Sequence, residues 1–462
     1  MLFNSLVFLF AFLPATYAVF WRLKRRNARY AWLTLTGYVF YAGWDYRFCA
    51  LMATSTVAAY LAGLGFLRWH DARPRRFCLI APITLDLALL GFFKYAGFGL
   101  DTVNRLAGWL DLPMFLSGPE IILPVGISFY TFHTITYIVD AYRGTIVPTR
   151  NFFEFSCYVS LFSQLVAGPI VRFRQIERDL EHIHEHRPGA TWNVGWSFFV
   201  IGMMKKVLVA DTIAAIIDPA LADYRTLSTV GAWLCMLGYA YQLYFDFSGY
   251  SDMATGLGHL FGLRIPKNFD SPYQATDPSD FWRRWHISLS TCLRDYLYIP
   301  LGGSRHAAWR TARNIMITML LGGLWHGANW TFVGWGAYHG LLLVAYRLRR
   351  HAWDGLPRPL RRGVMFLLVV LGWVLFRAET WTMARSLLGT MFSWTVAPAV
   401  PGLPGLLLGT AVAAVIAHAG RNSWQLEHRW SAAAGVGLAT LFALSLLVIT
   451  AGQRTPFLYF QF

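Results

Sequence analysis

The sequence has 462 residues, of which 56% are hydrophobic and only 14% are charged. A soluble globular protein averages about 25% charged residues, so this composition excludes a string of soluble domains and predicts a polytopic membrane protein. The net charge of +16 could suggest nucleic-acid binding, but the cations gather in short connectors at 22–26, 68–76 and 347–362. Cytoplasmic loops have this pattern, and we therefore predict contact with anionic lipids and no nucleic acid.

Long apolar runs recur along the chain, and many approach the length of about 20 residues that crosses a bilayer. Backbone groups in lipid must hydrogen-bond internally, so these runs are predicted to be helices. The predicted spans are 2–21, 30–44, 50–67, 79–97, 121–138, 152–170, 192–210, 230–247, 311–323, 330–345, 363–376, 403–418 and 432–449. The predicted fold class is an all-α polytopic membrane protein with roughly 11–13 membrane helices or re-entrant segments.

The N-terminal apolar stretch has no basic region before it, and its positive charge follows at Arg22. This order predicts an uncleaved first helix with its N-terminus outside. Alternating sides from there would place the charged segment 172–189 outside, against its composition. We therefore expect 152–170, which contains Gly168 and Pro169, to enter and leave on one side, next to a funnel or tunnel.

Two segments are predicted to lie at the membrane surface. The stretch 100–119 is amphiphilic and is expected on the outer face. The stretch 270–290 mixes prolines, acids, arginines and aromatic residues. It is expected to form an interfacial helix that begins at a cap made by Ser279 or Asp280.

Two histidines, His286 and His326, lie 40 residues apart, and each follows a tryptophan in an apolar stretch. An ionisable group at membrane depth is costly and is a candidate functional residue. A neutral imidazole beside tryptophan could act as a general base, and a hydrogen-bonded core histidine is the alternative. His339 lies about 220° around a helix and about 20 Å from His326, which favours a structural role.

Two acids, Asp246 and Asp252, lie beside an apolar run. They could line a tunnel or anchor Arg283 or Arg284, and the alternative is helix capping with an internal ion pair.

Metal and thiol chemistry receive little support from the sequence. The five cysteines are scattered without metal-ligand or redox spacing, and Cys292, six residues after His286, is interpreted as an apolar filler rather than a nucleophile. The three histidines within 181–186 are interpreted as part of a solvated loop. We expect no bound metal.

Four blocks of sequence carry a family resemblance. They are RWHISLS (284–290), WHGANW (325–330), FDFSGYSDMATGLG (245–258) and the terminal PFLYFQF (456–462). In their order along the chain, 245–258, 284–290, 325–330 and 456–462, and over nearly its whole length, they resemble the membrane-bound O-acyltransferase family, most closely its alginate O-acetyltransferase branch. The resemblance implies that residues 1–462 form one membrane-embedded domain around a central tunnel. Its parts would be N-terminal helices (1–120), a catalytic core (121–345) and C-terminal helices (346–462).

The resemblance also implies an enzyme, an O-acyltransferase, and a set of site residues. His326 matches the catalytic histidine of the family and His286 the second histidine of the branch. The residues expected to support them or line the tunnel are Trp325, Asn329, Arg283, Arg284, Asp246 and Asp280. Lys205 and Lys206 would snorkel at an interface or meet a donor phosphate.

The expected reaction moves an acetyl group from a cytoplasmic donor, acetyl-CoA, to a secreted polysaccharide such as alginate. No bound cofactor is expected. A periplasmic or membrane-anchored acetyltransferase is the expected partner, and a bacterial inner membrane the expected location. Peptidoglycan O-acetylation and D-alanyl transfer are the alternatives within the family, and a multispan transporter is the alternative outside it.

Overall fold

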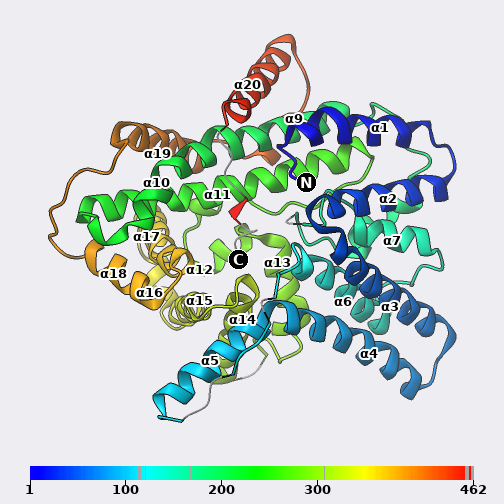
Figure 1. The fold of residues 1–462 in the computed structure, drawn as a ribbon, viewed down its shortest axis with the longest axis horizontal. Coiled ribbons are helices and arrows are strands. Elements are labelled where there is room, and N and C mark those ends of the chain that lie inside the picture. Colours follow the sequence, from blue (N-terminus) through cyan, green and yellow to red (C-terminus); the bar gives the residue numbers. More distant parts are fainter. Residues whose placement is uncertain (113–115, 120, 167, 306, 453–456, 459–462) are drawn as a thin grey trace. The chain divides into compact units, whose positions relative to one another are not determined.

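The computed structural model describes residues 1–112, 116–119, 121–166, 168–305, 307–452 and 457–458. The chain is 75% helical, and its described residues contain no strand (Figure 1). The predicted all-α class is therefore confirmed.

The α-helices are α1 (Leu13–Arg22), α2 (Arg26–Asp45), α3 (Cys49–Arg68), α4 (Ala72–Leu90), α5 (Ala96–Trp109), α6 (Ile127–Arg143), α7 (Phe152–Ser160), α8 (Phe173–Glu181), α9 (Trp192–Met204), α10 (Asp211–Ala222), α11 (Thr229–Leu260), α12 (Pro278–Arg284), α13 (Ile287–Leu293), α14 (Ala308–His326), α15 (Trp330–Leu348), α16 (Arg350–Asp354), α17 (Arg358–Arg377), α18 (Trp381–Met391), α19 (Leu403–His418) and α20 (Ala432–Thr450). Wider π-helical turns occupy Phe8–Phe12, Gly91–Tyr95, Lys205–Ala210 and Arg294–Tyr298.

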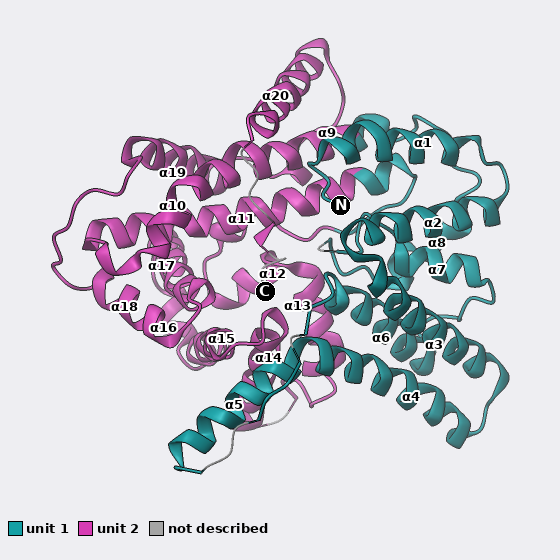
Figure 2. Cartoon of the chain, viewed as in Figure 1, with its two compact units in different colours: residues 1–195, 257–266 teal, residues 196–256, 267–462 magenta. Residues whose placement is uncertain are grey.

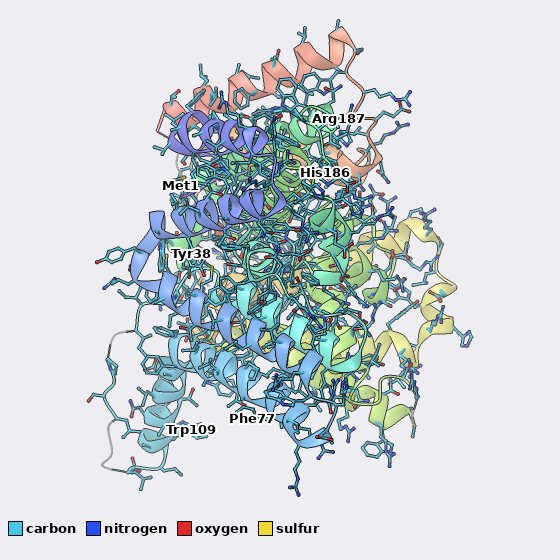
Figure 3. All side chains as sticks on the ribbon, turned by 90° about the vertical axis from the view of Figure 1, so that its right-hand side faces the viewer. Met1, Tyr38, Phe77, Trp109, His186 and Arg187 are labelled. Carbon is cyan, nitrogen blue, oxygen red and sulfur yellow. The ribbon has the colours of Figure 1, made fainter. Side chains whose placement is uncertain are left out.

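Several helical stretches are long and apolar enough to cross a membrane. Among the described residues these are Arg26–Arg68, Ala72–Trp109, Arg358–Arg377 and Ala432–Thr450. In the second of them the side chains of Phe77 and Trp109, labelled in Figure 3, are 71% and 88% exposed. Apolar surface of this kind is stable against lipid, and the chain is a multi-pass membrane protein.

The chain divides into two compact units, one made of residues 1–195 and 257–266 and the other of residues 196–256 and 267–462 (Figure 2). In the first unit α2 packs against α7, and α3 packs against both α4 and α6. The division into N-terminal helices, catalytic core and C-terminal helices stays a prediction.

The predicted span 152–170, in the first unit, is not one continuous helix. Helix α7 ends at Ser160, and no helix resumes among the described residues before Phe173. The irregular backbone is buried, and Gln164 Nε2 donates a hydrogen bond to the Tyr158 carbonyl at 2.7 Å. Backbone that is satisfied by protein in this way is tolerated at membrane depth. Its entry and exit on one side stay a prediction, and residue 167 lies outside the described part.

Two predicted segments differ from the observed helices. Helix α5 fills the first half of the predicted connector 100–119, of which residues 113–115 lie outside the described residues. Helix α11 continues well past the predicted end at 247 and includes both Asp246 and Asp252. The apolar run alone underestimated the length of α11. The polar residues that follow the run are buried within the protein and continue the helix.

In the second unit, α14 and α15 form a tightly packed pair (Figure 1). A Cβ atom added at Gly323 would overlap the Phe332 carbonyl oxygen, and one at Gly336 would overlap the Met319 carbonyl oxygen. The two glycines therefore permit close backbone approach. Because α14 ends at His326, this packing sets the C-terminal end of α14 against the first turns of α15.

Candidate active site

His326 is the last residue of α14 and lies in a cage of aromatic rings. Its side chain is only 4% exposed. The ring centroid of His326 lies 5.0 Å from that of Trp325, 5.1 Å from Trp335 and 5.3 Å from Phe376. Such rings exclude water and leave an imidazole with few competing solvent contacts.

His286 lies between the two seven-residue helices α12 and α13, and it is fully buried. Its ring centroid is 6.3 Å from that of His326 and 5.9 Å from that of Trp325. The structure therefore brings together the two histidines that the sequence places 40 residues apart. The break between α12 and α13 makes this convergence possible, because a continuous helix through residue 286 would point the His286 side chain in another direction.

The backbone at His286 has a positive φ of 44°, which is uncommon for a residue other than glycine. The Ile287 N–H, immediately after it, donates to the Asn268 carbonyl oxygen at 2.8 Å. On the ring itself, Phe247 packs edge-on with its centroid 4.7 Å away. Strained backbone that is held by its surroundings in this way is typical of functional sites.

Asn268 is a site residue that the sequence analysis missed. Its Oδ1 atom lies 3.2 Å from His286 Nδ1 and accepts hydrogen bonds from the backbone N–H and the hydroxyl of Ser288, at 3.2 and 2.8 Å. Its Nδ2 atom donates to Ser251 Oγ at 3.1 Å. A single asparagine in an irregular loop has no periodic or motif signal, so only the tertiary contacts identify it.

Burial sets the charge state of His286. It lowers the pKa of the His286 imidazole well below the ordinary range of histidine, because the surrounding protein disfavours the charged ring. His286 is therefore neutral near pH 7.

Asn329 was predicted to support the histidines, and its side chain caps a helix instead. Its Oδ1 atom accepts a hydrogen bond from the Thr331 N–H at 3.0 Å at the start of α15. Its Nδ2 atom donates to the Glu379 carbonyl oxygen at 2.8 Å. Both ends of the amide are thus used to fix the α14–α15 turn. A contribution of Asn329 to chemistry stays a prediction.

The predicted cap of α12 at Ser279 or Asp280 is wrong. The helix begins at Pro278, and the Asp277 carboxylate accepts from the Asp280 N–H at 2.8 Å. Proline has no N–H to satisfy and suits the first helical position, which leaves the preceding aspartate as the cap. The Asp280 carboxylate instead receives Arg284 Nε at 3.0 Å.

Asp246 does not anchor Arg283 or Arg284, as one interpretation of the sequence had it. Its carboxylate pairs with Lys206 Nζ at 2.7 Å and accepts the Leu458 N–H at 3.0 Å. The alternative, an internal ion pair, is confirmed. The C-terminal block 456–462 is described only at its second and third residues, and the rest lies outside the described part.

The two lysines were expected to snorkel or to meet a phosphate, and that expectation is wrong. Both are buried. Lys206 Nζ also lies 2.6 Å from the Asp211 carboxylate, while Lys205 Nζ lies 2.6 Å from Asp252 and 2.7 Å from Ser423 Oγ. The carboxylates belong to α10 and α11, and the sequence alone does not show which turns of these helices face the lysines.

A second ring layer connects His326 with His339. Trp335 contacts both, with centroid distances of 5.1 Å to His326 and 4.8 Å to His339, and Trp282 lies 5.3 Å from His339. The indole N–H of Trp335 is buried and has no hydrogen-bond partner among the described residues. A buried donor without a partner is costly, and beside His326 it is available to a substrate oxygen.

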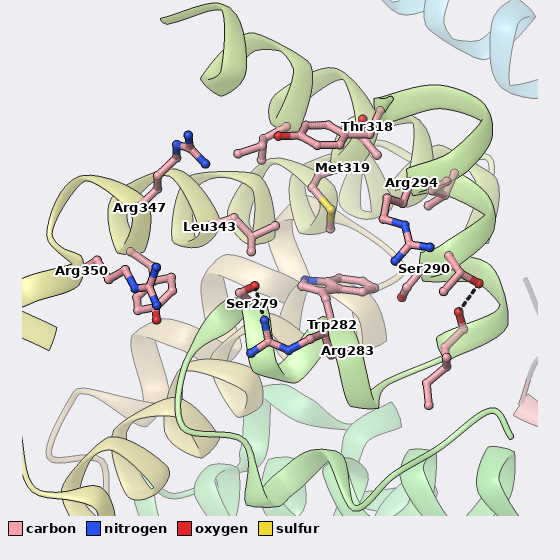
Figure 4. Close-up of a pocket in the computed structure, with 16 residues that line it drawn as sticks. Ser279, Trp282, Arg283, Ser290, Arg294, Thr318, Met319, Leu343, Arg347 and Arg350 are labelled. Atoms are coloured by element: carbon pink, nitrogen blue, oxygen red, sulfur yellow. Dashed lines mark hydrogen bonds between the residues drawn. The ribbon is translucent and has the colours of Figure 1, made fainter. Parts of the chain in front are cut away.

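A cavity of about 600 Å³ lies on the other side of Trp282. Four arginines line it: Arg283, Arg294, Arg347 and Arg350. The guanidinium groups of Arg347 and Arg350 lie on one side and that of Arg294 on the other, with Trp282 between them (Figure 4).

No carboxylate contributes to the described lining of this cavity. Three of the arginines pair with carboxylates outside the lining, Arg283 with Asp280 at 3.6 Å, Arg294 with Asp295 at 2.7 Å and Arg350 with Asp354 at 3.2 Å. Arg347 makes no ion pair with the described residues. A site of this charge suits phosphate or carboxylate groups.

No cluster of three or more metal-ligating side chains occurs among the described residues. Cys292 is a buried cysteine in α13.

Comparisons with known proteins agree on one family. The model of the membrane-bound O-acyltransferase family matches residues 129–376. The chain is 41% identical to a protein of Azotobacter vinelandii named "Probable alginate O-acetylase AlgI", over the whole of both chains. A Pseudomonas aeruginosa protein of the same name is 45% identical over 90% of this chain and 80% of its own. A Helicobacter pylori protein named "Peptidoglycan O-acetyltransferase" is 36% identical over 85% of this chain and 80% of its own.

Proposed function

The chain belongs to the membrane-bound O-acyltransferase family, and from this premise we propose that it moves acetyl groups from cytoplasmic acetyl-CoA toward a secreted polysaccharide such as alginate. That it is a membrane O-acetyltransferase follows from its relatives, and this excludes the transporter alternative. The relatives named for alginate match at 41% and 45% identity and the one named for peptidoglycan at 36%, which favours alginate. Bacterial inner membrane is the proposed location.

One observation carries this proposal: two buried histidines, 6.3 Å apart between ring centroids, lie in an aromatic cage beside an arginine-lined cavity. Acetyl transfer needs a base for the attacking hydroxyl and donors for the carbonyl oxygen. It also needs a site for the carrier of the acetyl group. The three requirements are met by neighbouring parts of the second unit.

In the proposed mechanism, His326 acts as the base. It takes the proton of the acceptor hydroxyl while the hydroxyl oxygen bonds to the thioester carbon, and such help is worth about 10²–10⁴-fold. The carbonyl oxygen gains negative charge and is stabilised by the indole N–H of Trp335, which has no protein partner among the described residues. The carbon–sulfur bond then breaks, and the thiolate receives the proton that His326 took.

The arginine-lined cavity is the proposed seat of the phosphates of acetyl-CoA. Arg347 and Arg350 belong to the basic connector 347–362, which the positive-inside rule places in the cytoplasm. Guanidinium groups bind phosphate oxygens bidentately. Trp282 lines the cavity and its ring centroid lies 5.7 Å from that of Trp335, which lies 5.1 Å from that of His326. The thioester arm would reach past these rings to the histidines.

The donor site can be tested with radiolabelled acetyl-CoA and membrane vesicles that expose the cytoplasmic face. Replacing the unpaired arginine, Arg347→Gln, should raise KM for acetyl-CoA about tenfold or more, because a charge-assisted hydrogen bond is worth about 1.5–3 kcal/mol. The matched control is Arg310→Gln, an exposed arginine of α14 outside the cavity. Equal KM values in both variants would contradict the donor site.

The acceptor is tested by deleting the gene and measuring acetyl esters on each envelope polysaccharide. The proposal expects acetylation of one secreted polysaccharide to disappear and to return with the wild-type gene. A partner acetyltransferase in the periplasm or anchored to the membrane is proposed to complete the transfer, so its deletion should give the same loss. Unchanged esters on every envelope polysaccharide would overturn the proposed function.

A further inference from the structure

The orientation of the Asn268 amide is fixed by its neighbours. The backbone N–H of Ser288 can only donate a hydrogen bond, and it points at the Asn268 side-chain oxygen from 3.2 Å. The amide nitrogen therefore faces the other way, where it donates to Ser251 Oγ at 3.1 Å. An amide turned over would set two donors against each other at Ser288, so the oxygen must face His286.

This orientation determines which nitrogen of His286 carries the proton. The Asn268 oxygen lies 3.2 Å from His286 Nδ1 and can only accept. Ser288 Oγ lies 3.4 Å from the same nitrogen, but its hydrogen is donated to the Asn268 oxygen at 2.8 Å, so both oxygens face Nδ1 as acceptors and Nδ1 carries the hydrogen. In a neutral imidazole the other nitrogen, Nε2, then has a lone pair and no proton. His286 in this state can take a proton, and it cannot donate one to a carbonyl oxygen.

We propose that Asn268 is a positioning residue that holds His286 in this tautomer, so that Nε2 of His286 accepts a proton during acetyl transfer. This inference rests on the proposed function and deepens it, because it makes His286 a second proton acceptor beside His326 rather than an oxyanion donor. Either imidazole can then take the single proton that leaves the acceptor hydroxyl, and that proton ends on the thiolate.

The backbone of Asn268 supports the same arrangement. Its carbonyl oxygen accepts from the Ile287 N–H at 2.8 Å, which holds the strained loop at His286. Phe247 and Phe269 pack against the ring of His286, with centroid distances of 4.7 and 6.4 Å. The ring is thus held by aromatic contacts and at its Nδ1 edge, where Asn268 Oδ1 at 3.2 Å is nearer than Ser288 Oγ at 3.4 Å.

The test compares two replacements of Asn268 in membranes supplied with acetyl-CoA. Asn268→Leu keeps the approximate volume and removes the acceptor, and Asn268→Asp keeps an acceptor for Nδ1. We expect Asn268→Leu to lower kcat about 100-fold or more without changing KM for acetyl-CoA, and Asn268→Asp to restore most of the loss. Ser251→Ala is the control, because it removes the partner of the amide nitrogen and leaves the oxygen in place.

A double variant separates positioning from a general structural role. If Asn268 acts through His286, then Asn268→Leu added to His286→Ala should cause no further loss of kcat. Additive losses would overturn the inference, as would an Asn268→Asp variant that is folded yet as slow as Asn268→Leu. His286→Ala with wild-type turnover would also overturn it. Failure of the proposed function is a separate outcome, because wild-type membranes would then transfer no acetyl group from acetyl-CoA.

Discussion

Two buried polar regions of the second unit are built in opposite ways. The lysines at 205 and 206 are surrounded by three carboxylates, and the nitrogen–oxygen distances of these ion pairs are 2.6–2.7 Å. The histidines at 286 and 326 are surrounded by aromatic rings, and His286 is hydrogen-bonded to a neutral amide. Both regions are buried, so burial alone does not distinguish a structural cluster from a chemical one.

The difference lies in how the polar groups are compensated. A lysine paired with carboxylates at this distance has its charge balanced, and the pairs join helices within the unit. Burial lowers the pKa of the His286 imidazole, which stays neutral and keeps the capacity to exchange a proton. Breaking the first region should therefore unfold the protein, whereas breaking the second should leave a folded protein that does not transfer acetyl groups.

The largest effect on stability is expected from Lys206→Met. It would leave the carboxylates of Asp211 and Asp246 without their shared cation and cost about 3–5 kcal/mol of folding free energy. The comparison is Lys267→Met, which removes a partly exposed pair with Asp270 and should cost about 1 kcal/mol or less. The measurement is thermal unfolding of both variants in the same detergent. Similar unfolding temperatures of the two variants would contradict the claim that the buried pairs of Lys206 stabilise the fold.

Trp335→Phe tests the histidine region without removing a histidine. It keeps an aromatic ring and removes the indole N–H beside His326, and a lost oxyanion donor costs about 10²–10³-fold in kcat. Trp373→Phe is the matched control, since its N–H already donates to the Tyr273 hydroxyl at 3.1 Å. Initial rates of acetyl transfer should fall in the first variant far more than in the second. Equal rates would remove Trp335 from the mechanism.

Asn329→Ala tests whether Asn329 has a structural role or a role in the reaction. Because both ends of the Asn329 amide fix the turn into α15, its loss should lower stability by about 1 kcal/mol. The rate of acetyl transfer per folded molecule should change little. A rate loss above about 100-fold, comparable to losing a general base, would return Asn329 to the chemical group that the sequence analysis gave it.

The smallest effect concerns pH. Burial lowers the pKa of His286 in the folded state, so below about pH 6.5 the unfolded chain binds a proton that the folded chain does not. Folding stability should therefore fall by up to about 1.4 kcal/mol per pH unit as pH decreases below that value. His286→Asn should show a shallower decrease in unfolding temperature between about pH 6.5 and 5.5. Parallel curves would mean that His286 is already protonated in the folded protein.

The sequence predicted what depends on local pattern. Apolar runs located most helices, and the observed α19 has the bounds predicted for 403–418. The tryptophan–histidine motifs predicted that His286 and His326 can converge, and the structure brings their rings to 6.3 Å. The break after α7 also followed from local polarity, because glycine, proline and a glutamine interrupt an otherwise apolar run.

What the sequence could not predict depends on the register between helices. The sequence left open whether Asp246 lines a tunnel, anchors an arginine or forms an internal ion pair, and it pairs with Lys206, because one turn of α11 decides which cation it meets. Asn268, Trp335 and the arginine-lined cavity were missed as functional groups for the same reason. Their importance comes from what lies next to them in space, such as the ring of His286 or the ring of His326.

The most direct test is the rate of acetyl transfer by His326→Ala at a measured amount of folded protein. The account predicts a loss of at least about 100-fold in polysaccharide acetylation, with the unfolding temperature close to that of the wild type, because the change removes a base from an otherwise intact ring cage. Wild-type acetylation by this variant, at equal expression, would contradict the central claim that the imidazole of His326 carries the reaction.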